Sequence, residues 1–275
     1  MVKIALMVLL SLAPVGCAPV VNTDVATLKD PGRYEVTLAG SGVTLGGILF
    51  RPSTAKALPA IIVLHGWAQP GVAGAPRVEG AARQLSEHGY VALALSMRGW
   101  PPSGGQDDCG MRQPEDVVKA ADWLASVPGV DSEAIGILGF SLGGQVALLA
   151  GAQSDRIQAI AAYYPVTDIQ RWRVTTSSSG IRDVYIPQVC GKGISNSPVN
   201  SVAKIRAPVL LIHGDRDTLV PTEQSLRMRA ALQKANRYVE LLVIAGGDHG
   251  FTEKQNEEAW SMVKQFFDEQ LKRRQ

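Results

Sequence analysis

The sequence predicts an α/β fold: a doubly wound, mostly parallel sheet flanked by helices, with a short lid insertion. Two observations lead to this prediction. Apolar, strand-like runs alternate with helix-like periodic segments over most of the 275 residues, and this order places helices on both faces of a parallel sheet. One of these strands leads directly into Gly139-Phe140-Ser141-Leu142-Gly143 and then a helix, so that Ser141 is expected on a tight, exposed turn.

The individual elements follow in a regular order. Two short strands at 34–38 and 43–50 surround Ala39-Gly40-Ser41-Gly42 and predict a hairpin. Gly89 has the place of a C-terminal cap after the first helix. The rest of the chain predicts strands at 60–64, 91–95, 134–140, 157–163, 208–213 and 238–244, and helices at 78–88, 113–126, 143–152, 222–235 and 255–272.

Residues 166–203 interrupt this alternation. They show weak periodicity and include the polar run Thr175-Thr176-Ser177-Ser178-Ser179-Gly180. Structureless loops of this length are uncommon in a compact domain unless they cover a site. We therefore expect a lid that contains a short helix, inserted in a single domain over 34–275.

The N-terminus predicts export. Residues 1–17 begin with a basic end at Lys3 and continue with an apolar run, which is typical of a signal peptide. Val15-Gly16-Cys17 resembles the end of a bacterial lipobox, which would make Cys17 a lipidated membrane tether; ordinary signal cleavage is the alternative. Residues 18–33 would then be a polar spacer, and the protein would be in the cell envelope, the periplasm or the medium.

Cysteine content and charge limit the possible partners. After export, Cys109 and Cys190 would form an even pair in an oxidising compartment, so a disulfide is possible and two free thiols are the alternative. The formal net charge of +2 is spread over mixed signs and argues against a nucleic-acid partner. No metal site or cofactor is expected, because His and Cys lack ligand spacing and no phosphate-binding glycine loop follows a strand.

A serine nucleophile needs a base to take its proton and a carboxylate to orient that base. The chain has four histidines. Active groups of a doubly wound sheet lie beyond the carboxyl ends of its strands, so His249, which follows the last strand in a glycine-rich loop, is the predicted base. His88 precedes a strand and is excluded, and His65 is expected to be structural.

The carboxylate is expected between serine and histidine along the chain. The segment His213-Gly214-Asp215-Arg216-Asp217 follows a strand and supplies two candidates. Asp217 is the predicted acid, and Asp215 is expected to make turn hydrogen bonds. Asp248 adjoins His249 but is poorly placed to accept its ring N–H.

Hydrolysis also needs donors directed at the developing oxyanion. The backbone N–H groups of Leu142, directly after the serine, and of Trp67, after the 60–64 strand, are predicted to supply them. Trp67, Trp100 and Trp172 fall on loops expected near the active face, where they would line a pocket or simply be buried.

These features resemble the α/β-hydrolase fold over roughly residues 34–270. Residues 197–214 and 239–251 more narrowly resemble the catalytic domain of prolyl-oligopeptidase-type serine peptidases. Dienelactone-hydrolase-like enzymes share both stretches, but their usual nucleophile is cysteine where this chain has Ser141. The resemblance implies a serine, aspartate and histidine triad and leaves the substrate open.

Together the motifs predict an exported serine hydrolase that cleaves a small-molecule carboxylic ester through an acyl-enzyme. A small prolyl-oligopeptidase-like peptidase that acts on short peptides is the alternative enzyme. A catalytically silent, tethered binding protein is the alternative of another class, and the intact triad argues against it. The lid arginines would bind a substrate carboxylate or form a solvated positive face; they are Arg171, Arg173 and Arg182.

Overall fold

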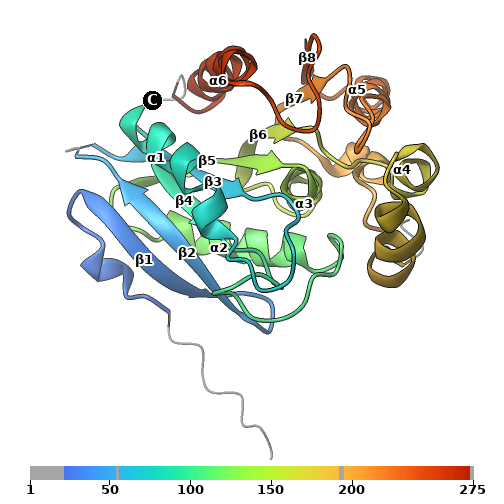
Figure 1. Cartoon of the computed structure of the whole chain (residues 1–275). Helices are drawn as coiled ribbons and strands as arrows, with labels where there is room; N and C mark the ends of the chain where they lie inside the picture. The colour runs from blue at the N-terminus through green and yellow to red at the C-terminus, as the bar shows by residue number, and fades with distance from the viewer. Residues whose placement is uncertain (1–21, 54–55, 192–194, 273–275) are drawn as a thin grey trace, which may run out of the picture.

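The computed structural model describes residues 22–53, 56–191 and 195–272. The predicted signal peptide and Cys17 lie outside the described residues. Within them, eight strands form one sheet in the order β1-β2-β4-β3-β5-β6-β7-β8 (Figure 1). The strands are β1 Gly32–Ala39, β2 Thr44–Arg51, β3 Leu58–Leu64, β4 Val91–Leu95, β5 Val130–Phe140, β6 Ile157–Tyr163, β7 Val209–Gly214 and β8 Val239–Ile244.

The sheet is mostly parallel. β1 and β2 form the predicted antiparallel hairpin, and β2 pairs antiparallel with β4. All other neighbours pair in parallel, from β4 and β3 through to β8. The carboxyl ends of these strands therefore meet at one edge of the sheet, where the loops after β3, β5, β7 and β8 lie close together. The predicted fold class is confirmed.

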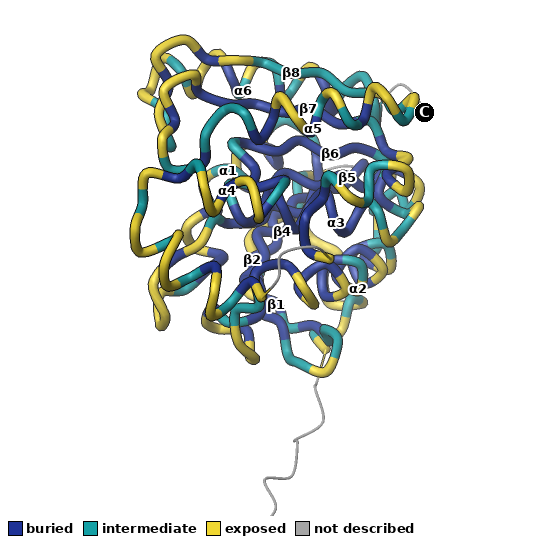
Figure 2. Tube along the Cα trace, turned by 90° about the vertical axis from the view of Figure 1, so that its right-hand side faces the viewer, coloured by how far each residue is buried: buried dark blue, intermediate teal, exposed yellow. Residues whose placement is uncertain are grey.

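Helices cover both faces of the sheet, each above a separate apolar layer. Ile62 and Leu64 of β3 pack with α2, α3 and α5 on one face, whereas Ile61 and Val63 pack with α1 and α6 on the other. Figure 2 shows the strands as a buried layer between these helices. The long helices are α1 Glu79–Glu87, α2 Gln113–Ala125, α3 Leu142–Gly151, α5 Glu223–Lys234 and α6 Glu253–Phe267.

Local sequence explains where these helices begin. The Thr252 hydroxyl accepts the Gln255 N–H while the Gln255 side chain accepts the Thr252 N–H, a capping box that starts α6. α2 begins with Pro114 in its first turn, where a proline costs no hydrogen bond. No helix among residues 22–53, 56–191 and 195–272 is both long and apolar enough to cross a bilayer.

The folded domain begins earlier in the chain than the sequence predicted. The described part of the predicted spacer 18–33 contains the short helix η1 (Val25–Thr27), capped by Asp24, and β1 already begins at Gly32. Leu28 is 1% exposed and belongs to the core on the α2 side of the sheet. The few apolar residues of this segment, Leu28 among them, show no helical or strand periodicity, so the sequence did not reveal this packing.

Residues 166–203 contain more helix than predicted. α4 (Ile169–Thr175) begins at Asp168, whose carboxylate accepts the Arg171 N–H. A π-helical segment, η3 (Ile181–Cys190), follows it. Figure 1 shows α4 and its neighbouring helix at the side of the sheet, beside α3 and α5. The remaining short helices are η2 Ala75–Arg77, η4 Pro198–Asn200, η5 Val202–Lys204 and η6 Asp268–Lys272.

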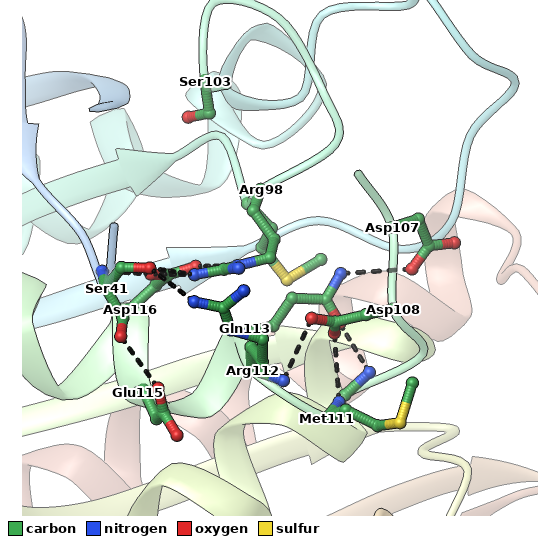
Figure 3. Close-up of polar contacts among 12 residues, drawn as sticks. Ser41, Arg98, Ser103, Asp107, Asp108, Met111, Arg112, Gln113, Glu115 and Asp116 are labelled. Carbon is green, nitrogen blue, oxygen red and sulfur yellow. Dashed lines mark hydrogen bonds and ion pairs between the residues drawn. The ribbon is translucent and has the colours of Figure 1, made fainter. Parts of the chain in front are cut away.

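The loop between β4 and α2 is held by buried polar contacts. The Arg98 guanidinium donates to both carboxylate oxygens of Asp116, at 2.6 and 2.8 Å, and to the Ser41 carbonyl at 2.9 Å (Figure 3). Both side chains of this ion pair are buried, which makes the loss of one partner costly. Further along, Gln113 donates to Asp107 at 3.2 Å. These contacts fix the loop that carries Cys109.

Candidate active site

Ser141 lies on the turn between β5 and α3 in a strained backbone conformation. Its φ and ψ angles are 54° and −115°, a region that residues with a Cβ rarely adopt. The Ser141 N–H donates to the Tyr163 carbonyl at 2.9 Å, which ties the turn to β6. The turn thus projects the hydroxyl beyond the carboxyl edge of the sheet, at the N-terminus of α3.

The glycines of the turn are required by close backbone contacts. A Cβ on Gly143 would lie 2.5 Å from the Leu64 carbonyl oxygen and 2.6 Å from that of His65. Such contacts do not occur for real side chains, so only glycine lets α3 approach the end of β3 this closely. The Gly-x-Ser-x-Gly pattern therefore reflects the packing of strand, turn and helix as well as the exposure of serine.

The structure brings the three predicted triad residues together. The His249 Nε2 lies 3.0 Å from the Ser141 Oγ, and the His249 Nδ1 lies 2.7 Å from the Asp217 Oδ2. Because a carboxylate can only accept, Nδ1 carries the proton and Nε2 is free to accept the serine hydroxyl. This is the geometry of a general base held by a carboxylate.

Asp217 is kept ionised in a buried position. Burial raises the pKa of its carboxyl, but hydrogen bonds from His213 and His249 and from the Val220 N–H outweigh burial and lower the pKa to about 2. The N–H groups of Leu219 and Val220 donate to Oδ1 at 3.0 and 2.8 Å. The whole carboxylate is thus solvated by protein donors and faces the imidazole as an anion.

His213 supports Asp217 at Oδ2, the same oxygen that faces His249. Its ring is completely buried, its Nε2–H donates to the Val220 carbonyl at 2.7 Å, and its Nδ1 accepts the Ser225 hydroxyl at 2.7 Å. The same Nε2 lies 3.4 Å from the Asp217 Oδ2. The principal bond is therefore to the carbonyl, and the same N–H is a weaker, shared donor that helps to lower the pKa of Asp217. Sequence reasoning did not assign this residue a role.

Tyr164 contacts the base and was also missed by sequence reasoning. Its ring centroid lies 4.5 Å from that of His249, and its φ is 37°. Burial, and then the charge of Asp217, raise the pKa of its hydroxyl to about 12. The ring limits where the imidazole can lie. Its position after β6, next to the nucleophile turn, is the only sequence signal that could have indicated it.

The other candidate bases and acids lie away from the Ser141 hydroxyl. Asp215 accepts the Gly246 N–H at 2.7 Å, a bond between the loops after β7 and β8 rather than within a turn. Asp248 accepts the backbone N–H of His249 rather than its ring. His65 is buried, and its Nε2 accepts the Met97 N–H at 3.1 Å. Burial, followed by the charge of Arg77, lowers its pKa to about 4 although its bond to Gly66 opposes this, so it is neutral.

A pocket of about 1080 Å³ opens onto Ser141 and His249. Three segments form its walls: the loop after β3 with the start of α1, the helices α4 and η3, and the loop after β7. Leu142 and Trp67, whose N–H groups are the predicted oxyanion donors, both line it. A Cβ on Gly66 would lie 3.3 Å from the Ser141 Cβ, so the loop that carries Trp67 passes directly beside the nucleophile.

The tryptophans and lid arginines divide between the pocket and the rest of the fold. Trp67 and Trp172 line the pocket, but Trp100 does not. Trp100 is buried, and its indole donates to the Ala68 carbonyl at 3.0 Å. None of the described lining residues is Arg171, Arg173 or Arg182. Arg171 pairs with Glu223 and Arg182 with Asp183, which leaves the predicted carboxylate role of these arginines without structural support.

A disulfide joins the β4–α2 loop to the pocket wall. Cys109 and Cys190 are bonded across 81 residues of sequence, which resolves the alternative between a bridge and two free thiols. Beside it, the Tyr185 hydroxyl donates to Asp107 at 2.9 Å. Tyr185 lines the pocket and contacts the Trp67 ring edge-on at 5.9 Å between centroids. The disulfide and the bond from Tyr185 to Asp107 therefore hold η3 against the β4–α2 loop.

Among the described residues, no group of three or more His, Cys, Asp or Glu side chains could hold a metal ion. The arrangement that the structure does contain can carry out acyl transfer: a hydroxyl within reach of an imidazole, a buried carboxylate behind that imidazole, and a largely apolar pocket beside the hydroxyl.

Comparison with known proteins agrees with this arrangement. A protein of Bacillus subtilis (strain 168) named "Uncharacterized peptidase YtmA" is 25% identical over 230 residues, which cover 81% of this chain and 88% of that protein. A Synechocystis protein named "Putative carboxymethylenebutenolidase" is 24% identical over 264 residues, covering 86% and 96%. Dipeptidyl-peptidase 5 of Porphyromonas gingivalis is 27% identical over 216 residues, covering 73% and 32%.

Solved structures share the fold. A puromycin-hydrolyzing peptidase of Mycobacterium tuberculosis superposes with a TM-score of 0.78 at 21% identity, over 88% of this chain and 39% of that one. The acylaminoacyl peptidase of Pyrococcus horikoshii gives 0.75 at 21% identity, over 90% and 43%. The chain thus spans about two fifths of the length of these two proteins.

The family follows from a match over most of the chain. Residues 77–274 match the prolyl oligopeptidase family, and this range contains Ser141, Asp217 and His249. More than half of the sequence is covered. The chain therefore belongs to the prolyl oligopeptidase family and is a serine hydrolase with the α/β-hydrolase fold.

Proposed function

We propose that this protein is an exported hydrolase that cleaves a carboxylic ester through an acyl-enzyme, with Ser141 as nucleophile, His249 as base and Asp217 as acid. The observation that carries the proposal is the continuous hydrogen-bonded path from the Ser141 hydroxyl through His249 to Asp217. The residues 166–203 act as the lid, and the N–H groups of Leu142 and Trp67 form the oxyanion hole.

The reaction has two steps, acylation of Ser141 and hydrolysis of the acyl-enzyme. The Ser141 Oγ forms a bond to the ester carbonyl carbon, His249 takes the hydroxyl proton, and the bond to the leaving alkoxide breaks as His249 returns that proton to it. Water then attacks the acyl-enzyme with His249 again as base, which releases the acid and restores the serine. The N–H donors stabilise the oxyanion of both tetrahedral intermediates.

An ester substrate is favoured over a peptide with a free amino terminus. None of the described residues that line the pocket is Asp or Glu, so a substrate ammonium would have no carboxylate to replace its lost hydration. A relative named as a butenolidase is matched along 96% of its length. Peptidase activity is the second candidate, favoured by the family match and by the peptidase name of the Bacillus subtilis relative.

The experiment compares two leaving groups on one acyl group. N-acetylalanine p-nitrophenyl ester and N-acetylalanine p-nitroanilide are offered to the purified protein and to Ser141→Ala. We expect ester turnover that disappears in the variant, with anilide turnover far slower. Anilide turnover as fast as that of the ester would favour the peptidase. Silence on both, with no labelling of Ser141 by a fluorophosphonate, would leave the binding protein as the surviving alternative.

Export and tethering are part of the same proposal. The Cys109–Cys190 disulfide supports an oxidising compartment. Mass spectrometry of the mature protein from the native cell distinguishes a diacylglyceryl group on Cys17 from ordinary cleavage near it. A protein that retains residues 1–17 in the cytoplasm would contradict export.

A further inference from the structure

The charge of the pocket wall differs sharply from that of the chain as a whole. The protein has 25 acidic and 27 basic residues, yet the described lining contains no Asp or Glu and one Arg, Arg77. Apart from Arg77 and the two histidines His65 and His249, the lining side chains are apolar or neutral. His65 is neutral because burial lowers its pKa to about 4.

Arg77 has no partner within the described part of the protein. Its guanidinium makes no ion pair and no hydrogen bond to another described residue. The nearest acidic residue along the chain, Glu79, already accepts the Arg33 guanidinium at 2.7 Å. By contrast, Arg171 and Arg182 on the lid are both paired with carboxylates. Arg77 is therefore available to a ligand in a way that the lid arginines are not.

The backbone that carries Arg77 is firmly positioned. η2 (Ala75–Arg77) is held by the Gly74 N–H, which donates to the Pro101 carbonyl at 3.0 Å, and by the Ala75 N–H, which donates to the Ser96 hydroxyl at 2.7 Å. Val78 and Ala81 continue the same wall into α1. An arginine on a fixed turn loses less freedom on binding than one on a mobile loop.

We propose that Arg77 is a specificity residue that selects substrates carrying an anionic group, a carboxylate, at the end of the acyl chain remote from the scissile ester. This inference rests on the proposed ester hydrolysis. An apolar, acid-free pocket with one unpaired guanidinium stabilises a carboxylate by a charge-assisted hydrogen bond, disfavours an ammonium and is indifferent to a neutral chain. A monoester of a dicarboxylic acid is the simplest substrate of this class.

Three esters of equal chain length test the proposal. They are mono-p-nitrophenyl adipate, which is anionic, p-nitrophenyl hexanoate, which is neutral, and p-nitrophenyl 6-aminohexanoate, which is cationic. kcat/KM is measured for each with wild type, Arg77→Gln and Arg77→Lys, with Ser141→Ala as the background rate. Arg83→Gln is the matched control, because Arg83 is an exposed arginine of α1 that does not line the pocket.

The quantity compared is the ratio of kcat/KM for adipate to that for hexanoate. We expect this ratio to fall about tenfold in Arg77→Gln, to fall less in Arg77→Lys, and to stay at the wild-type value in Arg83→Gln. The effect should shrink in high salt, because the site is open to solvent. Relative turnover of the aminohexanoate ester should rise in Arg77→Gln.

The failures are distinguishable. Hydrolysis of the hexanoate ester by wild type but not by Ser141→Ala would support the proposed ester hydrolysis. If the adipate to hexanoate ratio of kcat/KM is then the same within twofold in wild type and Arg77→Gln, the inference about Arg77 is overturned and the proposed function is unaffected. If wild type and Ser141→Ala are equally inactive on all three esters, the proposed function fails and the inference fails with it. An equal fall of the ratio in Arg83→Gln would also overturn the inference, since it would show a general surface-charge effect.

Discussion

His213 Nε2 lies 3.4 Å from the Asp217 Oδ2, the same oxygen that accepts the His249 Nδ1–H at 2.7 Å, so two imidazoles meet at one carboxylate oxygen. Both side chains are shielded from solvent. Because His213 does not line the pocket, its influence on catalysis must pass through Asp217. That makes it a positioning residue.

Substitution of His213 should lower kcat without a comparable change in KM. In His213→Leu the carboxylate loses this neighbour, and we expect kcat to fall about tenfold while KM changes little. Steady-state kinetics on an ester measure both. Ser225→Ala is the control, because it removes a bond at the other ring nitrogen and leaves the Asp217 side intact. Equal losses of kcat in the two variants would mean that His213 merely supports the fold.

The backbone of Ser141 predicts a conflict between stability and activity. Glycine tolerates the observed φ of 54°, whereas alanine carries the same strain as serine. We expect both Ser141→Gly and Ser141→Ala to be inactive, and the glycine variant to have a free energy of unfolding about 1 kcal/mol higher than the alanine variant. Urea denaturation measures this difference.

A matched pair of variants, Lys119→Gly and Lys119→Ala, should differ in free energy of unfolding in the opposite direction. Lys119 is exposed in the middle of α2, where glycine is less stable than alanine by about 1 kcal/mol. If Ser141→Gly were also less stable than Ser141→Ala, the turn would store no strain that glycine relieves.

The sequence could predict those parts of the fold that depend on local periodicity and on strand ends. The strand–helix order and the approach of Ser141, Asp217 and His249 both follow from parallel strands that end at one edge. The contact between His213 and Asp217 could not be predicted, because it depends on how the loop after β7 folds back. The sequence left open whether Trp100 lines the pocket or is buried, for a similar reason: the loop after β4 places its ring against His65, 5.1 Å between centroids.

Loss of the Cys109–Cys190 disulfide should affect the position of η3 in the pocket wall more than that of the catalytic triad. Cys109→Ala/Cys190→Ala removes a cross-link that spans 81 residues, and we expect a loss of about 2–5 kcal/mol in the free energy of unfolding. Because η3 carries Tyr185 into the pocket wall, KM should rise more than kcat falls. Calorimetry and ester kinetics measure these effects. Tyr185→Phe, which keeps the ring and loses the bond to Asp107, should raise KM less.

The buried His65 predicts how stability depends on pH. Burial is the main cause that lowers its pKa from the ordinary 6.5 to about 4 in the folded protein. The unfolded chain therefore binds a proton below pH 6.5 that the folded chain does not bind until about pH 4. Above pH 6.5, the pKa of His65 in the unfolded chain, this histidine does not lower the free energy of unfolding. As the pH falls from 6.5 to about 4, the free energy of unfolding decreases by about 2–3 kcal/mol.

Denaturation of wild type and His65→Gln from pH 7 to pH 4 tests this expectation. The variant is less stable at pH 7, because the Met97 N–H and the Gly66 carbonyl lose their well-placed partner. Its free energy of unfolding should nevertheless fall less between pH 6.5 and pH 4, since glutamine does not titrate; 6.5 and 4 are the two limits of the His65 window. Parallel curves would show that His65 already takes up its proton in the folded protein, and that the site tolerates a charged imidazole beside Arg77.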